Sequence, residues 1–160
     1  MNEATRLIYI HGSESDSNSG KARLFRQRFP GMLTPDFKGS FDERMRQLHE
    51  ILSDRTGWTL IGSSYGGLMA TVFTLEHEDQ IRKLVLLAPA LTEEIAPLPK
   101  PGPIFVPTIL IHGTQDTVVP FESVREIAQR LFSNLTLYEV DDDHRLHRAA
   151  DELDWNTILG

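Results

Sequence analysis

Short apolar runs alternate along this chain with segments whose apolar residues recur at helical spacing. Runs without polar interruption are typical of strands that are buried on both faces of a parallel sheet. Five runs rich in Val, Ile, Leu, Thr and Tyr are predicted to be strands: Leu7–Ile10, Thr59–Ile61, Leu84–Ala88, Thr108–Ile111 and Leu135–Val140. A weaker sixth strand is predicted at Met32–Pro35.

The segments between these runs have the period of amphipathic helices. They include Ala22–Phe29, Phe41–Leu52, Leu68–Leu75 and Val124–Leu131. Ser40 and Glu43 form a capping-box pattern at the start of the second segment. The alternation predicts an α/β fold in one domain over residues 1–160: an open, mostly parallel sheet of about six strands, with helices on both faces and no large lid domain.

Composition excludes several classes of function. The chain has no cysteine, so disulfides, a thiolate nucleophile and cysteine metal sites are excluded. A net charge of −7 argues against nucleic acid as a partner. No apolar run is long enough for membrane insertion, and Met1–Arg6 lacks the layout of a signal peptide, so we expect a cytoplasmic protein. No metal site is predicted.

The chain contains one G-x-S-x-G sequence, Gly62-Ser63-Ser64-Tyr65-Gly66. It follows a predicted buried strand and opens a helical segment, which is the setting of a nucleophile elbow. A serine there lies on a sharp turn, and glycines two residues away let strand and helix approach each other. This context favours Ser64 as a nucleophile over the alternative of a glycine-rich turn with an incidental serine.

A serine nucleophile needs a base, and the base needs a carboxylate that orients it. Asp116 lies in the loop after a predicted strand, and His144 directly follows the last one. The order serine, acid, histidine is that of α/β hydrolases. Three alternatives stay open: Asp116 as a helix cap, His144 as a surface residue, and His147 as the base.

Two backbone N–H groups are candidates for an oxyanion hole. The first belongs to Tyr65, the residue after the nucleophile. The second belongs to Ser13, because His11-Gly12-Ser13 ends an earlier strand and Gly12 allows the chain to turn inward. The alternative for His11-Gly12 is an ordinary turn at the end of a strand.

These motifs together resemble the α/β-hydrolase superfamily over nearly the whole chain. The segments Ile10–Ser13, Pro35–Ser40, Gly62–Gly67, His112–Pro120 and Asp143–Leu146 are similar to small YqiA-like esterases and ABHD10-like thioesterases. The resemblance implies their fold, a Ser-His-Asp triad and no cofactor. The chain begins at what corresponds to the family's third strand, so we expect six parallel strands without the family's antiparallel edge hairpin.

The sequence therefore predicts a serine hydrolase that cleaves small carboxylic esters or thioesters through an acyl-enzyme. Its expected partner is a small acyl substrate, and a homo-oligomer is possible. Two alternatives stay open: the same triad acting on another bond, as in a peptidase, lactonase or C–C hydrolase, or a binding module without activity. Ala90–Pro107, with five of the nine prolines, is either a stiff surface connection or a short rim over the site. Such a rim predicts short acyl chains.

Overall fold

A computed structural model describes residues 6–92 and 102–160 of the chain. In these residues one sheet contains five parallel strands in the order β1-β2-β3-β4-β5. The strands are β1 (Leu7–Ile10), β2 (Trp58–Ser63), β3 (Ile81–Leu87), β4 (Thr108–Gly113) and β5 (Leu135–Val140). The predicted rim Ala90–Pro107 lies partly outside the described residues, which leave out Pro97, Pro99 and Pro101.

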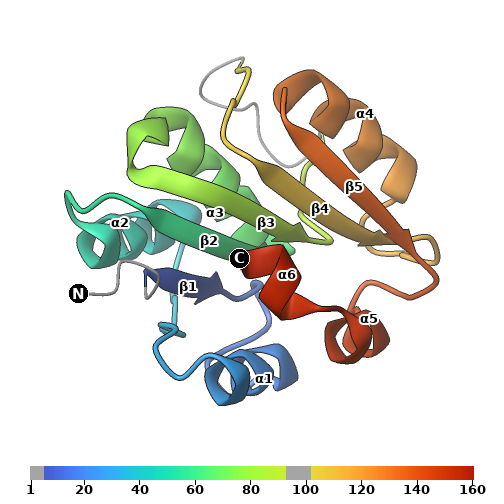
Figure 1. The fold of residues 1–160 in the computed structure, drawn as a ribbon, viewed down its shortest axis with the longest axis horizontal. Coiled ribbons are helices and arrows are strands. Elements are labelled where there is room, and N and C mark those ends of the chain that lie inside the picture. Colours follow the sequence, from blue (N-terminus) through green and yellow to red (C-terminus); the bar gives the residue numbers. More distant parts are fainter. Residues whose placement is uncertain (1–5, 93–101) are drawn as a thin grey trace.

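Helices cover both faces of the sheet, as the sequence predicts (Figure 1). One face packs against α2 (Phe41–Leu52), α3 (Tyr65–Glu76) and α4 (Phe121–Leu131). The other face packs against α1 (Gly20–Arg28), α5 (His147–Glu152) and α6 (Trp155–Leu159). A 3₁₀ turn, η2 (Glu78–Gln80), precedes β3.

The buried strands supply residues to both cores in alternation. Leu84 and Leu86 of β3 join the cluster under α2, α3 and α4. Val85 and Leu87 of the same strand join the cluster under α1, α5 and α6. Since successive side chains of a strand point to opposite faces, a strand covered on both sides must be apolar throughout. This is the reason for the continuous apolar runs in the sequence.

The prediction of a sixth strand at Met32–Pro35 is wrong, because this segment is not a strand of the sheet. Only Leu33 pairs with the sheet, through a single parallel bridge to Ile8 of β1. The Leu33 N–H donates to the Leu7 carbonyl, and the Leu33 carbonyl accepts from Tyr9 N–H, both at 2.9 Å. Pro35 has no N–H group to continue the ladder, so the segment leaves the sheet after one residue.

The direction in which the chain crosses over the sheet reverses at β1. The chain leaves β1 outward through α1 to Leu33, then returns past β1 through α2 to β2. Because such crossovers are right-handed, the two helices lie on opposite faces of the sheet. Ligands of open α/β sheets bind where the direction reverses in this way. No helix among the described residues is both long and apolar enough to span a bilayer.

Candidate active site

Ser64 lies at the turn between β2 and α3, in a backbone conformation that few side chains adopt. Its φ is 53° and its ψ is −114°, which is strained for a residue other than glycine. The Ser64 N–H donates to the Leu87 carbonyl, and the Ala90 N–H donates to the Ser64 carbonyl, both at 2.9 Å. Its side chain forms no cap with α3. Neighbouring backbone therefore holds the turn and leaves the hydroxyl available.

The glycines of the motif are required by backbone contacts. A Cβ at Gly62 would lie 2.4 Å from the Gly66 carbonyl oxygen, across the turn. A Cβ at Gly66 would lie 2.0 Å from the carbonyl oxygen of Ile10, at the end of β1. Gly62 thus brings strand and helix together, as predicted. Gly66 has a further effect that the sequence does not reveal, because it brings the helix onto the neighbouring strand.

Ser64, His144 and Asp116 form one chain of hydrogen bonds. The Ser64 hydroxyl lies 3.0 Å from Nε2 of His144. Nδ1 of His144 lies 2.7 Å from Oδ2 of Asp116. Because a carboxylate only accepts, Nδ1 carries the proton and Nε2 is free to accept from serine. This is the arrangement in which a histidine can take up a serine proton.

Asp116 is held by the loop that carries it and does not cap α4. Its Oδ1 accepts the N–H groups of Val118 and Val119 at 2.9 and 2.8 Å. The buried His112 lies beside it, with Nε2 2.8 Å from the Val119 carbonyl and 3.3 Å from Asp116 Oδ2. Burial lowers the pKa of His112, so this ring is neutral and donates from Nε2.

A glycine brings the Asp116 and His144 loops together. A Cβ at Gly113 would lie only 2.2 Å from the Asp142 carbonyl oxygen, so the chain after β5 crosses directly over the end of β4. The same carbonyl accepts the Gln115 N–H at 3.1 Å. No side chain at Gly113 could be accommodated, and sequence reasoning missed this position.

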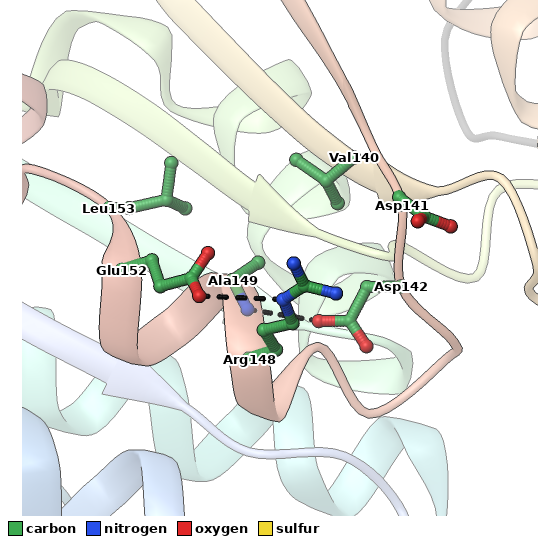
Figure 2. A pocket seen from close by; sticks show the side chains of 7 residues that line it. All are labelled: Val140, Asp141, Asp142, Arg148, Ala149, Glu152 and Leu153. Carbon is green, nitrogen blue, oxygen red and sulfur yellow. Dashed lines mark hydrogen bonds and ion pairs between the residues drawn. The ribbon is translucent and has the colours of Figure 1, made fainter.

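The segment that leads from β5 to His144 lies beside a cavity of about 340 Å³ (Figure 2). Its lining residues are Val140, Asp141, Asp142, Arg148, Ala149, Glu152 and Leu153. Oδ2 of Asp142 accepts the Ala149 N–H at 2.9 Å, and Arg148 pairs with Glu152 at 3.4 Å. Asp142 therefore anchors the start of α5, which follows His144. His147 is the first residue of that helix and is exposed. The structure therefore brings His144, and not His147, to Ser64.

The two predicted oxyanion donors are the N–H groups of Tyr65, which follows Ser64, and of Ser13, which follows Gly12 near the Ser64 side chain. Tyr65 is the first residue of α3, and among the described residues neither its N–H nor that of Ser13 has a hydrogen-bond acceptor. The N-terminus of α3 adds a partial positive charge at the same place. A Cβ at Gly12 would make only ordinary contacts at 3.5 Å, one of them with Ser64, so space alone does not require this glycine.

His11 orients the peptide that carries the Ser13 N–H. Its Nδ1 lies 2.7 Å from the Gly12 carbonyl oxygen, which belongs to the same peptide unit as that N–H. Its Nε2 accepts the Phe37 N–H at 2.9 Å. Since Nε2 accepts, Nδ1 donates, and the buried ring links the loop after β1 to the segment before α2. The sequence indicated the His-Gly turn but not this partner.

Arg44 of α2 is a further residue at the site that sequence reasoning missed. Its Nη2 contacts the Ser13 carbonyl at 3.4 Å, and its guanidinium lies over the Tyr65 ring at 5.6 Å. The one signal in the sequence is its position three residues after Phe41, on the otherwise apolar face of the helix. No group of three or more His, Asp or Glu side chains that could hold a metal occurs in the described part of the chain.

Comparisons with known proteins agree with this fold. Residues 36–105 match the sequence family described as the alpha/beta hydrolase fold. The structure of alpha/beta hydrolase domain-containing protein 10 from mouse is similar with a TM-score of 0.78 at 20% identity, covering 95% of this chain and 87% of that one. No curated protein matches the sequence.

Two further solved structures are similar over most of both chains. An esterase from Exiguobacterium antarcticum has a TM-score of 0.79 at 17% identity, covering 96% of this chain and 90% of that one. A monoacylglycerol lipase from Paleococcus ferrophilus has a TM-score of 0.68 at 17% identity, covering 96% of this chain and 94% of that one. The chain therefore has the α/β-hydrolase fold.

Proposed function

We propose that this chain is a serine hydrolase that cleaves small carboxylic esters or thioesters. The observation that carries the proposal is the hydrogen-bond chain from Ser64 through His144 to Asp116. Serine alone is a weak nucleophile near neutral pH, and a histidine oriented by a carboxylate is the device that activates it.

In the proposed reaction, Oγ of Ser64 attacks the acyl carbon while Nε2 of His144 takes the hydroxyl proton. Asp116 keeps the other ring nitrogen protonated and stabilises the imidazolium. The N–H groups of Ser13 and Tyr65 stabilise the oxyanion of the tetrahedral intermediate, each contributing about 10²–10³ in rate. His144 then protonates the leaving alcohol or thiol, and an acyl-enzyme remains.

Water completes the cycle. It attacks the acyl carbon while His144 accepts one of its protons, and the second tetrahedral intermediate collapses to release the acid and restore the Ser64 hydroxyl. The esterase and the lipase among the similar structures are named for cleavage of carboxylic esters, which supports an ester as the first substrate to test.

A fluorophosphonate probe tests the nucleophile directly. The wild-type protein should be labelled on Ser64 and should hydrolyse p-nitrophenyl butyrate, whereas Ser64→Ala should lose labelling and at least about 10³-fold in kcat/KM. Ser63→Ala is the matched control, one residue away in the buried end of β2, and it should keep both. Labelling that persists in Ser64→Ala would exclude Ser64 as the nucleophile.

A further inference from the structure

Arg44 is a buried cation that has no counter-ion among the described residues. Its side chain leaves α2 and only 9% of the residue is exposed. Nε donates to the Gly39 carbonyl at 3.0 Å, and Nη2 contacts the Ser13 carbonyl at 3.4 Å. Nη1 is enclosed and has no hydrogen-bond partner, and no described carboxylate forms an ion pair with this arginine.

Such an arrangement is costly and calls for an explanation. A buried donor without an acceptor loses the hydrogen bonds that water would give it, and a buried charge without a partner costs more. The nearest carboxylate in sequence, Glu43, is used elsewhere, because it accepts the Ser40 N–H in the capping box of α2. Nothing in the described part of the chain therefore neutralises Arg44.

The position of this cation ties it to the reaction. Besides Gly39 it contacts Ser13 and Tyr65, the residues that carry the two predicted oxyanion donors. Ser13 is exposed and Tyr65 is partly exposed, so solvent reaches two of the residues that the guanidinium contacts. The partly buried ring of Phe41 packs edge-on against Tyr65 at 5.6 Å and adds apolar surface beside the charge.

We propose that Arg44 binds an anionic carboxylate of the substrate, so that the preferred esters or thioesters carry a negative charge. This inference rests on the proposed hydrolase function. A planar guanidinium can donate two parallel hydrogen bonds to a carboxylate. In Arg44, Nη1 has no hydrogen-bond partner and Nη2 has only the long contact with the Ser13 carbonyl, so these two nitrogens are the ones to donate. Because Nη1 is enclosed, binding includes a small rotation of Arg44 or Tyr65. On a chain of net charge −7, a local cation is needed to attract an anion.

Paired substrates that differ only in charge test the proposal. In the first pair the charge lies on the acyl side, in the 4-nitrophenyl monoesters of adipate and of its half-amide, adipamate. In the second it lies on the leaving group, in the butyrates of 3-hydroxybenzoate and 3-hydroxybenzamide. We expect kcat/KM for the charged member of one pair to exceed that for its neutral member by about 10–100-fold, as for a hydrogen-bonded ion. The pair that shows the preference locates the carboxylate.

Arg44→Gln should reduce that ratio to near one, and Arg44→Lys should retain part of it. Arg46→Gln removes the same charge from the exposed side of α2 and should leave the ratio unchanged. A ratio measured within one variant does not depend on how much of that variant is folded. Ratios near one for both pairs in the wild type, or a ratio that survives Arg44→Gln, would overturn the inference and leave the hydrolase function standing. No turnover of any of the four esters would overturn that function as well.

Discussion

Replacing Gly66 by alanine should separate the Ser64 turn from the loop after β1. The new Cβ would lie 2.0 Å from the Ile10 carbonyl oxygen and 2.6 Å from that of His11. Real Cβ atoms essentially never come within 3.0 Å of such atoms, so the helix and the loop must move apart by about 1 Å. Both obstructing atoms belong to the backbone, and no side chain can rotate to make room.

The displacement has two separate consequences. Overpacking of this kind costs about 1–3 kcal/mol of stability, measurable as a lower midpoint in urea unfolding. A shift of about 1 Å between Ser64 and the Ser13 N–H costs about 10²-fold in kcat/KM, because the oxyanion no longer meets both donors. Activity measured well below the unfolding transition should therefore fall far more than the folded fraction does.

Gly20→Ala provides the matched control. Gly20 begins α1, and a Cβ there would have no atom within 4 Å. This variant should keep full activity and remain within about 1 kcal/mol of wild-type stability, on the stabilising side. If Gly66→Ala kept wild-type stability to within about 0.5 kcal/mol and lost less than threefold in kcat/KM, the steric reasoning about the elbow would be refuted.

Three further predictions concern the base, its support and the substrate. His144→Ala should lose at least about 10³-fold in kcat/KM on p-nitrophenyl butyrate, whereas His147→Ala should lose less than threefold; the reverse order would assign the base to His147. Burial holds the pKa of His112 below 6.5, so the unfolded chain binds a proton that the native state does not, and stability should fall as pH drops below 6.5. His112→Gln should show a shallower fall in urea unfolding between pH 7.5 and 5, and an equal slope in the two proteins would contradict the assignment. On p-nitrophenyl esters, kcat/KM should peak at short acyl chains, because the predicted short rim leaves room to bury only a few methylenes; a continued rise to long chains would contradict this prediction.

Much of the fold is readable because the signals are local. Leu7–Ile10 and Leu135–Val140 were predicted with the bounds that the structure has. The capping box of Ser40 and Glu43 is present at the start of α2. The prediction of a strand at Met32–Pro35 was wrong because a strand forms only where a neighbouring strand pairs with it. Pairing beyond Leu33 depends on the direction that the chain takes next.

The candidate site likewise has features that the sequence predicts and features that only the tertiary structure shows. The sequence alone predicts the turn at Ser64 and places Asp116 and His144 just beyond strand ends. It can do so because these features depend on short-range patterns and on the order of the strands. The tertiary structure alone decided that His144 and not His147 meets Ser64, since Gly113 lets the loop after β5 cross the end of β4.

Contacts between residues far apart in sequence lay beyond any local pattern. His11 pairs with Phe37, and Arg44 lies between Ser13 and Tyr65, across separations of more than twenty residues. The type of a residue indicates which groups its side chain can bind, but not which backbone groups will lie next to it in the fold. Only the packing of α2 and α3 on the sheet brings that charged group beside the backbone that flanks Ser64.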